Sequence, residues 1–426
     1  MAHVLATAQP LALLKRPPPP KASFGDGNDK TPKARHGESE SDPAVGLAVA
    51  RPEFGEHGGV NMSIEASATF TVMEPDILRR LFTGELGPER DQLYIYSRHF
   101  NPTVLALGRQ MAALEGTEAA YCTASGMSAI SSVLMQLVGA GGHVVASRCL
   151  YGGTHALLSQ FLPRTSGVHT TFVDTDDEEA VRSAMKPGET RVVFVETMSN
   201  PTLAVADIPM LARLACEAGA KLVVDNTFTP VVVSPARLGA DVVVHSMSKF
   251  ISGGADIIAG AICGPACLLK AMMDLQDGAL MLLGPTMNAK VASELAGRLP
   301  HLPLRMQEHS RRAAEFATRM RRLGLHVTYP GLPDHPHNDR LSAMGNPGYG
   351  AGGMLCVDMG TEERANSLIT SSEMAPDDRA RAGISPGLIR MSIGYNGTLD
   401  QRWAQFERAV TLMKQETTSA SASKLI

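Results

Sequence analysis

The chain has 426 residues, which is enough for two domains or more, and 44% of them are hydrophobic. A net charge of −4 and an aromatic content of 5% argue against nucleic acids and anionic membranes as partners. The six cysteines lack the paired spacing of a zinc site, so we expect no metal and predict buried thiols in a reducing compartment. No apolar run approaches the length of a membrane-spanning helix.

Residues 1–50 are rich in proline, lysine and aspartate, and we predict a disordered tail. They show no secretory signal, and acidic residues are mixed with basic ones, whereas transit peptides are poor in acidic residues. We therefore expect a cytoplasmic protein, with a plastid or mitochondrion as the alternative. Residues 51–105 are polar and irregular apart from a helical stretch at 76–82, and we predict an arm that packs on a neighbouring subunit.

From residue 106 to about 295 the pattern alternates between short apolar strands and amphipathic helices. Repeated β–loop–α units predict an α/β fold, in which helices cover both faces of a mostly parallel sheet. Residues 296–426 form a predicted smaller α/β domain, with a helix at 304–323 and strands at 325–329 and 354–359. Strands of the large domain are predicted at 119–122, 143–147, 170–174, 191–196, 221–224 and 242–244.

Polar residues follow five of these predicted strands. They are Ser125, Tyr151, Asn200, Asp225 and Lys249. The carboxyl ends of parallel strands meet at one edge of a sheet, where open α/β sheets bind their ligands. Each residue alone has an ordinary explanation as a cap, a core tyrosine, a turn or a surface charge. Their shared position favours a single site.

Pyridoxal phosphate chemistry needs this combination of residues. Lys249 can form a Schiff base with the cofactor, and the Asp225 carboxylate can keep the pyridine nitrogen protonated. The turn at 125–127 opens a helix, whose N-terminal N–H groups suit a phosphate, and the Tyr151 ring could hold the cofactor flat. Dinucleotide binding would need a GxGxxG turn between a strand and a helix, which we do not find, and no phosphate-binding P-loop is present either.

Several long segments resemble the signature blocks of the cystathionine/methionine γ-family of pyridoxal phosphate enzymes, from about residue 50 to the C-terminus. The resemblance implies an aspartate-aminotransferase-like (fold type I) large domain. It also implies α,γ-elimination of L-methionine to methanethiol, 2-oxobutanoate and ammonia. The arm and the LMLLGPTMNAKVA block most resemble plant members of the family. The blocks are YSRHFNPT, TASGMSAI, LYGGTHALL, ETMSNPTL, VVDNTF, HSMSKFISGGADIIAG and GLIRMSIG.

The resemblance also implies a role for each matching residue. Lys249 would bind the cofactor and shuttle protons, Asp225 would face the ring nitrogen, and Asn200 would approach the ring hydroxyl. Tyr151 would stack on the ring and act as acid or base, and Arg390 would pair with the substrate carboxylate. A neighbouring subunit would complete the phosphate site, which implies a homodimer or homotetramer. The implied phosphate ligands are Ser125, Gly126, Met127, Ser246 and Ser248, with Tyr96 and Arg98 from the neighbour.

Two departures from the family pattern stand out. Bacterial methionine-cleaving members have cysteine where this chain has Gly153, so that position does not select the substrate. In addition, some thirty family residues are missing near 370–382, including a strand and a serine that helps to hold the substrate carboxylate. Elimination or replacement on cystathionine, homocysteine or an activated homoserine therefore remains an alternative. Another is a shortened, non-catalytic subunit that binds cofactor and assembles with full-length partners.

Overall fold

The computed structural model describes residues 42–50, 59, 61–362, 365 and 385–423. The predicted tail up to residue 41 and the predicted shortening at 370–382 lie outside the described residues. Residues 43–50, which we assigned to the disordered tail, instead form helix α1 (Pro43–Ala50). The sequence PAVGLAVA is apolar enough to pack, and Leu47 is buried in the main core. A Cβ atom at Gly46 would lie 2.7 Å from the Ala113 carbonyl oxygen, so this glycine lets α1 approach α4 (Pro102–Glu115) closely.

The main sheet has seven strands in the order β1-β7-β6-β5-β4-β2-β3. Every pairing that involves β7 is antiparallel, and the other pairings are parallel. The sheet is therefore mostly parallel, as predicted, and the predicted strands are each found within one or two residues of their expected ends. The strands are β1 (Ala119–Thr123), β2 (His143–Ser147), β3 (His169–Val173), β4 (Thr190–Glu196), β5 (Lys221–Asp225), β6 (Val242–Ser246) and β7 (Gly260–Gly264).

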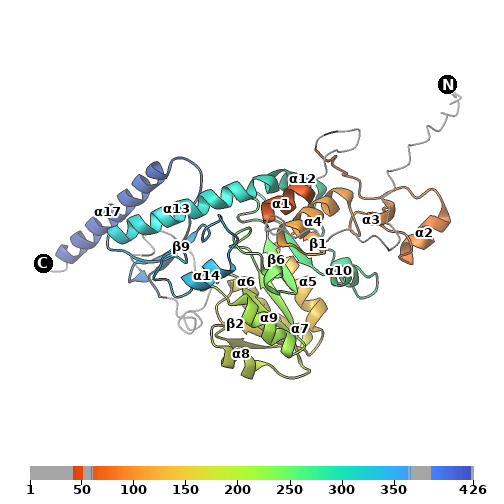
Figure 1. Cartoon of the computed structure of the whole chain (residues 1–426), viewed down its shortest axis with the longest axis horizontal. Helices are drawn as coiled ribbons and strands as arrows, with labels where there is room; N and C mark the ends of the chain where they lie inside the picture. The colour runs from red at the N-terminus through yellow and green to blue at the C-terminus, as the bar shows by residue number, and fades with distance from the viewer. Residues whose placement is uncertain (1–41, 51–58, 60, 363–364, 366–384, 424–426) are drawn as a thin grey trace, which may run out of the picture. The chain divides into compact units, whose positions relative to one another are not determined.

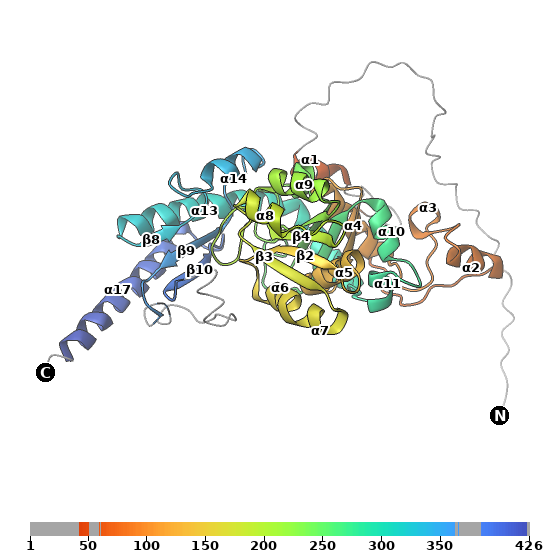
Figure 2. The ribbon, with the colours of Figure 1, turned by 90° about the horizontal axis from the view of Figure 1, so that it is seen from below.

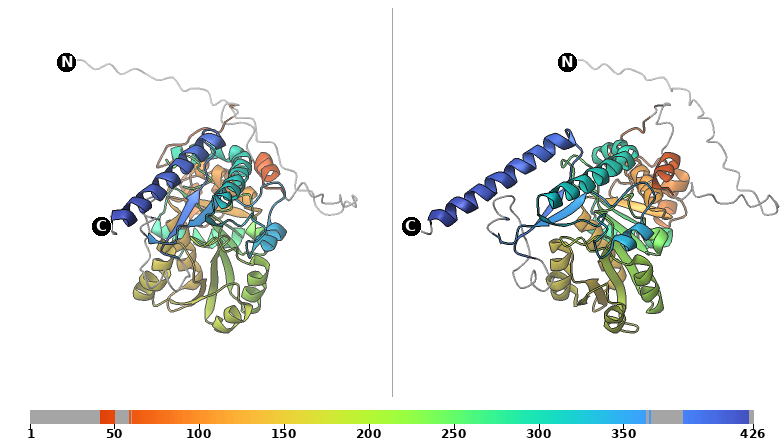
Figure 3. Two further views of the ribbon diagram at one scale, coloured as in Figure 1. Left: turned by 90° about the vertical axis from the view of Figure 1, so that its left-hand side faces the viewer. Right: turned by 60° about the vertical axis from the view of Figure 1, so that its left-hand side comes forward.

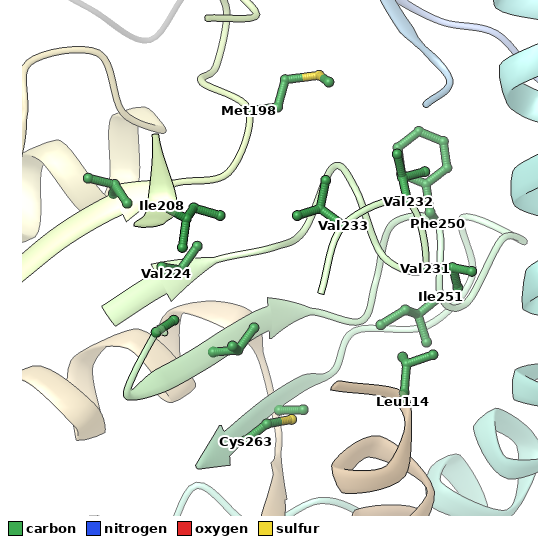
Figure 4. Packing of buried hydrophobic residues seen from close by; sticks show 14 of the residues in the cluster. Leu114, Met198, Ile208, Val224, Val231, Val232, Val233, Phe250, Ile251 and Cys263 are labelled. Carbon is green, nitrogen blue, oxygen red and sulfur yellow. The ribbon is translucent and has the colours of Figure 1, made fainter. Parts of the chain in front are cut away.

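Helices cover both faces of this sheet because successive strand residues point to opposite sides (Figures 1 and 2). On β5, Val224 joins the layer that contains Leu114 of α4, while Val223 joins the opposite layer. Figure 4 shows Val224, Leu114 and Cys263 within the first layer. That layer also takes residues from α8 (Glu178–Ala184), α9 (Ile208–Glu217) and α12 (Ala289–Arg298); the opposite layer takes residues from α5 (Gly126–Val138), α10 (Ala266–Met272) and α11 (Ala279–Leu283).

A second, antiparallel sheet has the strand order β10-β9-β8 among the described residues. Its strands are β8 (His326–Thr328), β9 (Met354–Asp358) and β10 (Leu388–Ser392). The long helix α13 (Leu302–Arg322) packs on this sheet, and α17 (Leu399–Ser423) packs across the end of α13 (Figure 3). Phe316 and Trp403 join the two helices edge to face, with ring centroids 5.5 Å apart. Arg390 lies at the centre of β10, opposite Cys356 of β9.

The described part of the arm contains α2 (Pro75–Phe82), as predicted, and α3 (Pro88–Asp91). A bridge between Thr69 and Tyr96 joins its two extended segments. Large apolar side chains of the arm, including Ile64, Met73 and Phe82, are exposed in this single chain. In the part of the chain that the structure describes, no helix is both long and apolar enough to cross a membrane.

Candidate active site

A cavity of about 590 Å³ opens at the carboxyl edge of the main sheet. Residues that are far apart in the sequence meet there because each follows the end of a strand. The cavity is also lined by β10 and by the segment after it, so the second sheet contributes to the same site. Of the residues that we predicted, Ser125, Gly126, Met127, Tyr151, Asn200, Asp225, Ser246, Ser248, Lys249 and Arg390 line it.

The turn between β1 and α5 has the geometry of an anion site. Ser125 is the N-cap of α5, and its Oγ accepts a hydrogen bond from the Ser128 backbone N–H at 3.1 Å. Ser128 Oγ in return accepts from the Ser125 N–H at 3.0 Å, which completes a capping box. Gly126 and Met127, whose N–H groups take no part in this capping box, line the cavity at the positive end of the helix dipole. A Cβ atom on Gly126 would lie 2.7 Å from Ser246 Cβ, so only glycine allows this approach.

Asp225 is the buried last residue of β5. Its Oδ1 accepts a hydrogen bond from the Thr227 N–H at 2.9 Å. Burial raises the pKa of Asp225, whereas the bonds from Thr227 and the nearby His245 lower it. A buried carboxylate with so few donors is suited to a cationic partner from the cavity.

Lys249 lies on the turn that follows β6, where it is accessible from the cavity. The turn is held from both sides. Ser248 Oγ accepts from the Ala259 N–H at 3.0 Å, and Arg305 of α13 donates to the Ile251 carbonyl oxygen at 2.8 Å. Hydrogen bonds thus hold the backbone around Lys249, and the lysine itself lines the cavity.

Tyr151 follows β2 and precedes the short helix α6 (Gly152–Ala156). Its ring lies against Gly153, where a Cβ atom would be 2.7 Å from Tyr151 Cε1 and 3.2 Å from Met127 Sδ. Gly153 therefore provides the space that the tyrosine ring occupies.

Arg390 reaches the cavity from the second sheet. Its guanidinium carbon lies 5.3 Å from the centroid of the Phe228 ring, and its Nη1 donates to Asn200 Oδ1. Arginine stacks on aromatic rings and binds carboxylates through two parallel N–H groups. Arg390 is thus present at the cavity, although the predicted shortening precedes it in the chain.

Tyr96 and Arg98 do not line the cavity of their own chain. Arg98 donates to the Met281 carbonyl oxygen at 2.8 Å, and its guanidinium carbon lies 5.4 Å from the Tyr96 ring centroid. Tyr96 is 40% exposed. Their predicted role at a neighbouring subunit stays a prediction.

Other residues also line the cavity, and we did not predict them as site residues; among them are Glu196, Thr227 and His309. Glu196 ends β4 within the ETMSNPTL block, so its position at a strand end could have identified it as a site residue from the sequence. Thr227 Oγ1 accepts from the Ser246 N–H at 2.8 Å and so joins two strand ends. His309 lies on α13, and its Nδ1 is 2.6 Å from the Ile393 carbonyl oxygen. No sequence pattern predicts that helix residue at the site.

The cavity residues fit pyridoxal phosphate. The close approach of Gly126 to Ser246 and the N–H groups at the start of α5 suit the phosphate. The buried Asp225 suits the ring nitrogen, and Lys249 is available to the aldehyde. Within the described residues, no cluster of three or more histidine, cysteine or acidic side chains could hold a metal ion.

Comparison with known proteins agrees with this geometry. Residues 47–375 match the family model described as Cys/Met metabolism PLP-dependent enzyme. The chain is 58% identical to methionine gamma-lyase of Arabidopsis thaliana, over 97% of this chain and all of the relative. It is 35% identical to O-succinylhomoserine sulfhydrylase of Pseudomonas aeruginosa, over 87% of this chain and 94% of the relative. The crystal structure of cystathionine gamma-lyase from Lactobacillus plantarum superposes with a TM-score of 0.77 at 27% identity, covering 87% of this chain and 99% of that chain.

These findings confirm the predicted family and fold type, and they confirm the likeness to plant methionine-cleaving members. The alignment with the Arabidopsis protein extends over 446 residues, which exceeds the 426 of this chain. Part of that relative therefore has no counterpart here. The location of the shortening near 370–382 stays a prediction.

Proposed function

Because the chain belongs to the family of PLP-dependent enzymes of Cys/Met metabolism, we propose that it is a methionine γ-lyase. It would convert L-methionine to methanethiol, 2-oxobutanoate and ammonia. The observation that carries this proposal is the convergence of Lys249, Asp225 and Arg390 on one cavity. The identity of 58% to methionine gamma-lyase supports methionine over the other sulfur amino acids.

Each side chain has a distinct task in this reaction. The bound cofactor supplies an electron sink for carbanions at the substrate α- and β-carbons. Arg390 binds the substrate carboxylate, and Asp225 holds the positive charge of the ring nitrogen. Lys249 takes the α-proton and carries protons between carbon atoms as a general acid–base group. Tyr151 assists departure of methanethiolate from the γ-carbon.

The test is an assay of the purified protein with methionine and with cystathionine, reading methanethiol and cysteine release separately. We expect methanethiol from methionine as the faster reaction. Faster cysteine release from cystathionine would replace the proposal with a cystathionine γ-lyase, which shares every named catalytic residue. Bound cofactor without turnover, together with mixed oligomers, would favour the non-catalytic subunit.

We also propose that two copies share each site in a homodimer or homotetramer. In this proposal, Tyr96 and Arg98 of the arm reach the phosphate of the neighbouring copy. The exposed apolar side chains of the arm support this, as does the 40% exposure of Tyr96. The division into an arm (51–105), a cofactor domain (106–295) and a C-terminal domain (296–426) belongs to the same proposal. A monomer by light scattering at micromolar concentration would contradict it.

For location we propose a reducing compartment, with the cytoplasm preferred over a plastid or mitochondrion. All six cysteines are free thiols, which supports such a compartment. Imaging of a full-length fluorescent fusion would test the location.

A further inference from the structure

Glu196 is a buried carboxyl group to which the proposed reaction gives no task. It ends β4, is 7% exposed and lines the cavity. Its partner in the sheet register is Asp225, the last residue of the neighbouring parallel strand β5. Because neighbouring strands lie about 4.8 Å apart, two carboxyl groups meet at one edge of the sheet. Burying two carboxyl groups so close together is costly unless hydrogen bonds or protonation compensate.

The two carboxyl oxygens of Glu196 hold two different loops. Oε1 accepts a hydrogen bond from the Tyr151 backbone N–H at 2.6 Å, and Oε2 accepts from the Asn200 backbone N–H at 2.8 Å. Tyr151 belongs to the loop after β2, and Asn200 to the loop after β4. One side chain thus joins the two loops that carry the residues expected on the ring and at its hydroxyl.

The connection continues to the substrate side of the cavity. The Asn200 side chain accepts a hydrogen bond from Arg390, the residue expected to bind the substrate carboxylate. Glu196 therefore stands at the start of a chain of contacts through Asn200 to Arg390. Its charge is also sensitive to its surroundings. Burial first, and then the neighbouring Asp225, raise the pKa of Glu196 to about 8, while the two N–H donors and Arg390 lower it.

We infer that Glu196 is a positioning residue, whose carboxyl group sets the distance between the Tyr151 loop and the Asn200 loop. It thereby orients the cofactor ring and, through Asn200, Arg390. The role in orienting Arg390 rests on the proposed function, whereas the role in orienting the cofactor does not. A carboxyl group can accept from both loops at once, but a carboxamide has a single acceptor oxygen.

The test is Glu196→Gln in the holoenzyme, with Glu179→Gln as the matched control on the surface helix α8. Glu179 is exposed, and its only described hydrogen bond is to Ser183. We expect Glu196→Gln to weaken cofactor binding about tenfold or more, because the amide can accept from only one of the two loops and one hydrogen bond is lost. We also expect a changed visible circular dichroism of the bound cofactor and a raised KM for methionine, and wild-type signals from the control.

Unchanged cofactor affinity and visible dichroism in a folded Glu196→Gln enzyme would overturn the inference. If that variant does not fold, hydrogen exchange in the wild-type holoenzyme decides: slow exchange of the Tyr151 and Asn200 amides supports it, and fast exchange overturns it. Cofactor dichroism needs no turnover. A wild-type enzyme without methanethiol release would therefore refute the proposed function and leave this test intact.

Discussion

His245 Nε2 lies 2.7 Å from Glu115 Oε1, and both side chains are buried. The same glutamate oxygen accepts from Asn226 Nδ2 at 3.0 Å. Asp225 and Ser246 end β5 and β6 and line the cavity. Asn226 follows Asp225 and His245 precedes Ser246, so this polar cluster stabilises the two strand ends. This buried oxygen is costly to remove, because His245 Nε2 then loses its partner and Asn226 Nδ2 is left with the Val233 carbonyl oxygen as acceptor.

We predict that Glu115→Ala lowers the stability of the protein, by about 1–3 kcal/mol for each donor left without an acceptor. Glu115→Gln retains an acceptor oxygen and should cost less. The measurement is the urea midpoint of unfolding at fixed protein and cofactor concentration. Glu179→Ala on the exposed face of α8 is the control. Equal midpoints for Glu115→Ala and the control would contradict the structural importance of the cluster.

Lys249→Ala should remove both the visible absorption band of lysine-bound cofactor and the release of methanethiol, since no other lysine of the described residues lines the cavity. Lys270→Ala changes an exposed lysine on α10 and should leave both signals unchanged. Spectroscopy and the methanethiol assay are run on the same preparations. Turnover retained by Lys249→Ala would remove this lysine from its assigned role.

Asp225→Asn should lower kcat by about a hundredfold or more, because a neutral amide does not stabilise a protonated ring nitrogen. The amide oxygen can still accept from the Thr227 N–H, so the loop is expected to keep its conformation. Steady-state kinetics with saturating cofactor measure the loss. A kcat within a few-fold of wild type would show that the ring charge does not depend on Asp225.

Gly153→Cys should lower kcat/KM without unfolding the protein. The new Cβ atom would lie 2.7 Å from Tyr151 Cε1, so the tyrosine ring must move. Gly297→Cys is the matched control, since no atom lies within 4 Å of a Cβ there. Kinetics and thermal unfolding are compared for the two variants. Wild-type kcat/KM in Gly153→Cys would mean that the ring position does not limit the reaction.

The raised pKa of Glu196 predicts a pH effect on the cofactor-free enzyme. A carboxyl group whose folded pKa lies above its unfolded value of 4.5 binds its proton more tightly in the folded state. Its contribution to stability is therefore complete below pH 4.5 and is lost as the pH rises through about 8. Relative to Glu196→Gln, the wild-type enzyme should lose stability from pH 5 to pH 8, which thermal unfolding at several pH values measures. If the unfolding temperatures of the two proteins change with pH in parallel, the raised pKa of Glu196 would be contradicted.

By itself, the sequence determined the strands of the main sheet except β7, their mostly parallel arrangement, and the strand-end residues that we propose hold the cofactor. These properties are local: apolar periodicity defines a strand, and a polar residue directly after it lies at the sheet edge. Lys249, Asp225 and the turn at 125–127 were identified for that reason. The apolar segment at 43–50 was misassigned, because its helix is stabilised by packing on α4, a partner some sixty residues away.

Tertiary structure alone decided the contacts that join distant segments. Register placed Glu196 beside Asp225, and the fold of the second sheet brought Arg390 to Asn200. Strand order determines which strand ends are neighbours, and no local pattern specifies that order. The size of the cavity and the space that Gly153 leaves for Tyr151 depend on atoms of several elements at once. Packing of the whole chain therefore determines the geometry with which the cofactor residues meet.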